Sequence, residues 1–201
     1  MLLSPMTRLP PEIIAYIFEL SLADEGESMP VPVPGDGPFH LTQVCKLWRA
    51  VAESDPHLWT SIHIYFPHAR QSREQDVPAV KPMLDLHLKR SGVLPISLTF
   101  ADHRFYHATT EGLVALLVDR LRTHSHRWKR ISLHLSCGYF PLLFTFMPCN
   151  LSALEHLQIS GEVLGQRRVT TLHLNLESAK NLRSFACSGP GHAVNYKIDL
   201  P

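Results

Sequence analysis

The sequence predicts a mixed α+β or α/β protein, in which an N-terminal helical module precedes irregular strand–helix units that form a partial solenoid. Two observations carry this prediction. Between residues 9 and 59, apolar residues recur at the spacing of amphipathic helices. From residue 61 onward, short segments that alternate apolar and polar residues are interleaved with helical patterns. We therefore divide the chain into a module at residues 1–66, a connecting loop and helix at 67–92, and a repeating region at 93–201.

The first helix is predicted to run from Pro10 to about Leu22. Proline suits a first helical turn because the amides there have no intrahelical partner. Glu12 in the same turn suits the positive end of the helix dipole. The apolar residues that recur at i, i+1, i+4 and i+5 should share one face of this helix: Ile13, Ile14, Ile17 and Phe18.

A proline-rich insertion is predicted at residues 23–38. Acidic residues open it, and prolines then alternate with valines and glycines, which favours an extended, polyproline-like loop. Helices within a compact module are usually joined by about 2–8 residues, so this connection is unusually long.

A second helix is predicted from Leu41 to the Asp55-Pro56 pair, because proline disfavours helix at the residue before it. Leu58 and Trp59 add two large apolar groups directly afterwards. The residues of its apolar face follow the i, i+3, i+4, i+7 spacing: Leu41, Val44, Cys45, Trp48, Val51 and Ala52.

The repeating region is predicted from strands and helices that alternate along the chain. Helices are expected near residues 82–91 and 113–121, and residues 169–176 fit a strand or a helix equally well. The predicted strands, the first of which belongs to the module, are Ser61–Phe66, Pro95–Phe100, Arg130–Leu135, Leu154–Gly161 and Leu182–Gly189.

The spacing of the later strands points to leucine-rich units. The intervals from Leu133 to Leu157 and from there to Phe185 are 24 and 28 residues, close to the period of roughly 20–29 residues in leucine-rich repeats. The interval from Leu98 to Leu133 is 35 residues, too long for a regular repeat. A solenoid usually ends in a polar cap, and none is visible in the sequence. We expect residues 195–201 to fold back, or the chain to be shorter than the domain it was built from.

Composition argues against several classes of partner. Nineteen basic and eighteen acidic residues give a net charge of +1, which gives no reason to expect nucleic acid or an anionic membrane. The N-terminus lacks the apolar core of a signal peptide, so we expect a soluble protein of the cytoplasm or nucleus. The four cysteines form no Cys-x-x-Cys pair, and Cys45 and Cys187 lie in apolar patterns that favour burial. We expect no disulfide, no zinc site and, by default, a monomer.

No catalytic motif is present, so we expect a protein that is not an enzyme and needs no cofactor. Nucleophile-elbow, phosphate-loop, dinucleotide and His-Glu-x-x-His patterns are all missing from the sequence. Thirteen histidines raise the question of a metal, but His103 and His107 fall in a predicted loop. A modest basic cluster is best explained as a solvated edge: His124, His126, Arg127, Lys129 and Arg130, with Arg167 and Arg168 further on.

Residues 9–59 resemble an F-box. The F-box pattern has a Leu-Pro-x-Glu opening, an Ile/Leu-rich helix, a Val-Cys-x-x-Trp helix and a downstream tryptophan. This chain supplies the pattern in order, apart from the insertion at 23–38, with Leu9, Pro10, Glu12, Val44, Cys45, Trp48 and Trp59. The segments that follow resemble fungal F-box proteins with irregular leucine-rich repeats.

The resemblance implies a substrate-recognition subunit of a Skp–cullin–F-box ubiquitin ligase. The module would bind the Skp-type adaptor and, through it, a cullin, while the C-terminal region selects an unknown protein target. The alternative is a leucine-rich interaction scaffold with no role in ubiquitin ligation. The candidate adaptor contacts, some of which could instead pack the two helices together, are Leu9, Pro10, Ile13, Ile14, Ile17, Val44, Cys45 and Trp48.

A candidate substrate face follows from the strand pattern. If the units stack, the residues between the core leucines line one surface. The candidate contacts are His134, His156, Gln158 and Ser184, with Ser132 and Ala186 beside them.

Overall fold

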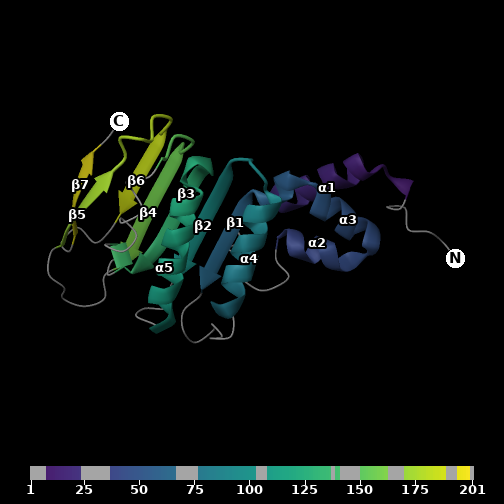
Figure 1. The fold of residues 1–201 in the computed structure, drawn as a ribbon, viewed down its shortest axis with the longest axis horizontal. Helices are drawn as coiled ribbons and strands as arrows, with labels where there is room; N and C mark the ends of the chain where they lie inside the picture. Colours follow the sequence, from purple (N-terminus) through teal and green to yellow (C-terminus); the bar gives the residue numbers. More distant parts are fainter. Residues whose placement is uncertain are drawn as a thin grey trace.

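A computed structural model describes residues 8–23, 37–66, 77–102, 108–136, 139–140, 150–162, 170–188 and 194–199. Over these residues the fold is a helical module placed at one edge of a parallel sheet (Figure 1). The module comprises α1 (Pro11–Ala23), α2 (Pro38–Val44), α3 (Lys46–Ser54) and the 3-10 helix η3 (Pro56–Trp59). The predicted order of N-terminal helices followed by strands that alternate with helices is confirmed.

Five parallel strands form the main sheet, in the order β1-β2-β3-β4-β6. These strands are β1 (Ser61–Phe66), β2 (Ile96–Asp102), β3 (Trp128–Ser136), β4 (His156–Glu162) and β6 (Ser184–Ser188). The connections include α4 (Val77–Arg90), α5 (Ala108–Thr123) and the 3-10 helix η5 (Ser125–Arg127). A separate two-stranded parallel sheet pairs β5 (Thr170–Asn175) with β7 (Val194–Asp199).

The prediction of one continuous second helix is wrong, because the chain forms two helices, α2 and α3, in that segment. α2 begins at Pro38, just after Gly37, whose φ of 62° suits a residue without a side chain. At Cys45 the backbone is extended, and the thiol accepts a hydrogen bond from the Trp48 amide at 3.5 Å. This bond caps α3 and restarts the helical register. Val44 and Cys45 are consequently exposed, not packed on one continuous face.

Two other segments differ from or refine the sequence prediction. α4 begins at Val77 and holds Pro82 in its interior, where we expected the helix to start. An interior proline removes one backbone donor without stopping this helix. The ambiguous segment at residues 169–176 forms strand β5, and its parallel partner β7 comes from the last residues of the chain, beyond the five-stranded sheet.

Some predicted features lie outside the described residues. They are most of the insertion at 23–38, the loop at 67–76, the residues Cys137, Cys149, His103, His107, Arg167 and Arg168, and the end of the chain from residue 200. None of the helices that the structure describes combines the length and the hydropathy needed to cross a bilayer.

One face of the main sheet forms the larger hydrophobic core. Successive side chains of a strand point to opposite faces, and the apolar set packs under α4 and α5 (Figure 1). The strands are in register, so the buried side chains form rows across the sheet. The two central apolar rows, buried except for their partly buried members on β6, are Ile62, Leu98, Ile131, Leu157 and Phe185, and Ile64, Phe100, Leu133, Ile159 and Cys187.

The module joins the sheet at an aromatic junction centred on Trp59, which is fully buried. The Trp59 indole donates a hydrogen bond to the Ala52 carbonyl at 2.7 Å. Its ring meets the Phe39 ring at 5.3 Å and the His87 ring at 5.1 Å, and the Arg90 guanidinium lies 4.3 Å above it. Because His87 and Arg90 belong to α4, this junction fixes the module against the sheet.

Arg127 is a buried cation that ties three segments together. Its guanidinium donates to the Leu94 carbonyl at 3.0 Å, the Leu88 carbonyl at 3.3 Å and the Ser91 hydroxyl at 2.7 Å. Burial lowers the pKa of Arg127. The side chain thus pairs the Leu88 carbonyl at the end of α4, where the helix has no further amide to offer, and the Leu94 carbonyl in the segment that follows.

Replacing Arg127 with methionine should lower the free energy of unfolding by roughly 2 kcal/mol, because buried acceptors lose a charged donor. Urea denaturation followed by circular dichroism measures this. The matched control is Arg183→Met at an exposed position, which should change stability by less than about 0.5 kcal/mol. Equal effects of the two substitutions would show that the buried hydrogen bonds of Arg127 do not stabilise the fold.

Candidate functional site

The exposed face of α1 carries an apolar stripe. Ile14 and Phe18 point inward and are almost completely buried, which fixes the orientation of the helix. The residues at i, i+3, i+4 and i+7 of the opposite face remain exposed although all are large and apolar: Ile13 (47%), Tyr16 (58%), Ile17 (37%) and Leu20 (52%). We call these four residues the α1 stripe.

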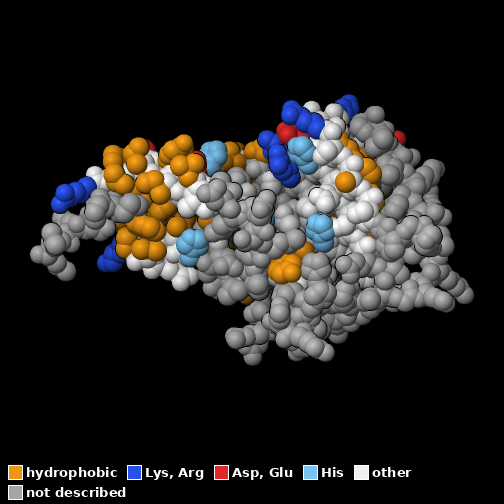
Figure 2. Space-filling model, turned by 180° about the vertical axis from the view of Figure 1, so that it is seen from behind, with side chains coloured by type: hydrophobic (Ala, Val, Ile, Leu, Met, Phe, Trp, Pro, Cys, Tyr) orange, Lys and Arg blue, Asp and Glu red, His pale blue; other side chains and the backbone are white. Residues whose placement is uncertain are grey.

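Several predicted adaptor contacts lie on the surface of the module. Pro10 is exposed, and its carbonyl begins α1 by accepting hydrogen bonds from the Ile13 and Ile14 amides. Val44 (57%) and Cys45 are exposed beside the break between α2 and α3. Figure 2 shows hydrophobic side chains gathered on the visible face of the module. Large exposed apolar patches of this kind mark interaction sites.

Three of the predicted contacts lie deeper. Ile14 has no exposed surface, so it belongs to the core, contrary to the prediction that it lies at the interface. Leu9 and Trp48 are half-buried and pack against the core of the module. The Trp48 ring lies 4.9 Å from the Phe18 ring, so Trp48 supports α1 while remaining partly exposed.

Sequence reasoning missed Tyr16 and Leu20. The predicted single face of Ile13, Ile14, Ile17 and Phe18 is in fact divided between a buried and an exposed apolar face of the helix. The signal was present: Tyr16 and Leu20 follow Ile13 at i+3 and i+7, the spacing of a second stripe.

The open face of the main sheet carries polar residues, also arranged in rows. The in-register pairing places one side chain of each strand in each row. The first polar row is Ser61, Ser97, Arg130, His156 and Ser184. The second polar row is His63, Thr99, Ser132, Gln158 and Ala186.

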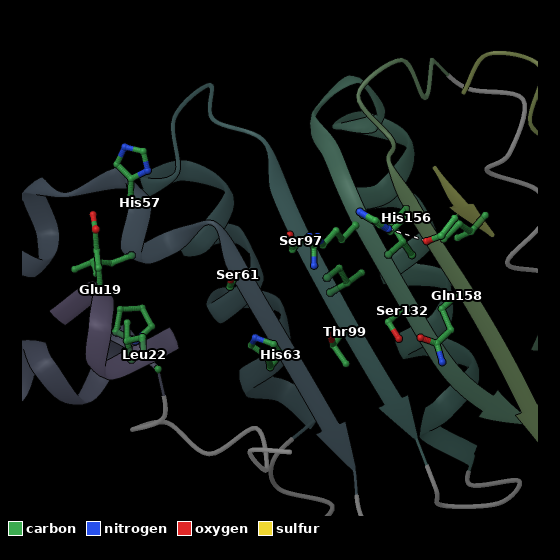
Figure 3. A pocket seen from close by; sticks show the side chains of 18 of the residues that line it. Glu19, Leu22, His57, Ser61, His63, Ser97, Thr99, Ser132, His156 and Gln158 are labelled. Atoms are coloured by element: carbon green, nitrogen blue, oxygen red, sulfur yellow. Dashed lines mark hydrogen bonds between the residues drawn. The ribbon is translucent and has the colours of Figure 1, made fainter. Parts of the chain in front are cut away.

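These two rows form the floor of a groove of about 880 Å³ (Figure 3). The wall is supplied by the module, from the end of α1, the start of α2 and η3. Glu19 and His57 lie at the module end of the groove, whereas His156 and Gln158 lie on β4, toward the other end (Figure 3). The groove therefore spans the module and all five strands of the main sheet.

Three of the four predicted substrate contacts line this groove: His156, Gln158 and Ser184. A hydrogen bond of 2.7 Å links the His156 imidazole to the Ser184 hydroxyl, which orients both side chains. His134 lies on the same face, one row further along the strands, but does not line the groove. It hydrogen-bonds the hydroxyls of Ser132 and Ser160 instead.

The basic cluster does not form one surface patch. Arg127 is buried, Lys129 lies 3.6 Å from the Glu155 carboxylate, and Arg130 points from the sheet into the groove. Within the described part of the chain, no group of three or more His, Cys, Asp or Glu side chains could hold a metal ion.

Comparison with known proteins relates part of this chain to a family. Searches of curated proteins and of solved structures found no significant match for this chain. Residues 6–65 match the model of the F-box-like family, and this range covers the helical module and nearly all of β1. The N-terminal part of the chain is therefore an F-box-like domain.

Proposed function

We propose that this protein is the substrate-recognition subunit of a Skp–cullin–F-box ubiquitin ligase, acting in the cytoplasm or nucleus. The F-box-like domain would bind the Skp-type adaptor, and the open face of the sheet would hold a protein target. The protein itself breaks and forms no bond. It raises the effective concentration of target lysines near the ubiquitin-carrying enzyme.

The observation that carries the proposal is the α1 stripe within the F-box-like domain. The module already has a closed core around Ile14, Phe18 and Trp59, so the stripe is not needed to fold it. Four large apolar residues left in water at helical spacing are the pattern of a helix that docks against a partner. Val44 and the partly exposed Trp48 extend the proposed adaptor surface.

Replacing Ile17 with glutamate should weaken binding of the purified Skp-type adaptor at least tenfold, since the substitution puts a charge into an apolar contact. Isothermal titration calorimetry with the full chain measures the dissociation constant. The full chain is needed because His87 and Arg90, which lie beyond residue 66, complete the junction around Trp59.

Val93→Glu is the matched control. Val93 is 89% exposed in the turn between α4 and β2, outside the module, so this variant should bind the adaptor like the unchanged chain. If Ile17→Glu also binds normally, the proposed interface is refuted. If the unchanged chain fails to bind any Skp-type adaptor, the ligase role itself is refuted.

The alternative is a protein-interaction scaffold in which the module only caps the sheet. One observation favours this alternative. The module is fixed to α4 through the contacts of Trp59 with Phe39, His87 and Arg90, as expected for a domain that covers the edge of a sheet. The adaptor titration separates the two functions. A module that only caps the sheet needs no exposed α1 stripe and should not bind the adaptor.

A further inference from the structure

The floor of the groove, formed by the two polar rows, carries a basic side chain but no acidic one. Its side chains are hydroxyls, an amide, imidazoles, one methyl and the single guanidinium of Arg130. Neither polar row contains an acidic residue. Among the lining residues that the structure describes, the carboxylate is that of Glu19, which α1 supplies at the module end. Arg130 is thus the one Lys or Arg residue of the two rows, which hold no Asp or Glu, and this balance of charge suits an anionic ligand.

Arg130 is the strongest of these donors. It is exposed, it sits in the central strand of the first polar row, and no carboxylate among the described residues forms an ion pair with it. The nearby Glu155 lies 3.6 Å from Lys129 and 3.9 Å from His156. The guanidinium of Arg130 is thus left available, and arginine binds a carboxylate through two parallel hydrogen bonds.

The dimensions fit an extended chain. Neighbouring strands lie about 4.8 Å apart, so the five strands present a floor roughly 19 Å long. An extended peptide covers about 3.3 Å per residue, so about six residues would cross the strands. Apart from Ala186, the side chains of the two polar rows are polar, and the apolar residues Leu22, Pro38 and Leu58 line the wall that the module supplies. Such a floor favours hydrogen bonds to a peptide over burial of an apolar anchor.

We propose that the groove binds an extended acidic segment of the target protein, with a carboxylate of that segment paired to Arg130. This inference rests on the proposed function and specifies the class of target protein. A carboxylate fits better than a phosphate, because phosphorylated segments are recognised by clusters of arginines and this floor offers one. His156 stands next to Arg130 in the first polar row and is held in place by Ser184.

The test is selection of peptides from a displayed random heptapeptide library on the immobilised full chain. We expect Asp and Glu to be enriched at one position at least threefold over the library. On the Arg130→Gln variant this enrichment should disappear, and on Arg130→Glu it should give way to Lys and Arg. The charge-matched control Lys89→Gln changes an exposed residue of α4, outside the groove, and should select like the unchanged chain.

One selected peptide is then synthesised with aspartate, asparagine or phosphoserine at the enriched position. Fluorescence anisotropy should show at least fivefold weaker binding of the asparagine form than of the aspartate form. Tighter binding of the phosphoserine form would overturn the proposal in favour of a phosphopeptide site. A selection without acidic enrichment, or one that Arg130→Glu leaves unchanged, would also overturn it.

Adaptor binding is measured on the same Arg130 variants. If these variants keep the adaptor and the peptide selection fails, only the groove assignment is lost. If the peptides are selected as expected and the unchanged chain binds no adaptor, the groove assignment stands and the ligase role is lost.

Discussion

Replacing Trp59 with alanine is expected to lower the free energy of unfolding by about 4 kcal/mol, the cost of removing a large buried aromatic side chain. Trp59 has no exposed surface and contacts residues of both the module and α4. Its loss leaves a cavity, an unpaired carbonyl at Ala52 and an Arg90 guanidinium without its aromatic partner. Urea denaturation monitored by circular dichroism measures the effect.

The Trp59→Phe variant separates packing from hydrogen bonding. Phenylalanine keeps an aromatic ring at the junction but cannot donate to the Ala52 carbonyl, so we expect a loss of roughly 2 kcal/mol, about half that of alanine. Leu20→Ala, on the exposed α1 stripe, is the control and should change stability by less than about 1 kcal/mol. If Trp59→Ala costs no more than this control, the junction does not hold the module to the sheet.

Acid should weaken the same junction through His87. Burial lowers the pKa of His87 from 6.5 to about 4, against the opposing effect of its hydrogen bond to the Trp59 carbonyl at 3.2 Å. The positive charges of His63 and Arg90 lower the pKa further. In the unfolded chain His87 takes up a proton below pH 6.5, whereas in the native protein it stays neutral down to about pH 4. The unfolded state therefore gains protons first, and stability falls as the pH drops through this window.

The expected loss between pH 6.5 and pH 4 is roughly 3 kcal/mol for this one group. Denaturation at successive pH values measures it, as the difference between the unchanged chain and His87→Gln, which has no proton to take up. The titration of the His87 ring by NMR is an independent check that needs no variant. A His87 pKa near 6.5 would contradict the prediction, and a parallel pH dependence in the two chains would do the same.

Much of the fold could be predicted from the sequence because local patterns decide it. β1 has the bounds Ser61–Phe66 expected from its alternation, and α1 begins and ends within a residue of the predicted helix. The break at Cys45 could not be predicted from periodicity. The extended backbone at Cys45 interrupts the helix that the apolar spacing had suggested, and the Cys45 thiol caps α3.

The candidate site was predictable in part. Alternation along a strand correctly placed His156, Gln158 and Ser184 on the open face, since side-chain direction follows from strand geometry alone. The wall of the groove could not be foreseen. Glu19 and His57 reach it because the junction at Trp59 sets the module beside β1, and that contact joins residues distant in the sequence.

The register of the main sheet separates recognition from packing. Each strand contributes one residue to each polar row. The residues directly before and after a residue of the second polar row point into the core. A substitution at Gln158 alters one position of the groove while Leu157 and Ile159 keep the buried rows intact. Mutation and selection can therefore change what the groove binds one strand at a time, without passing through poorly folded intermediates.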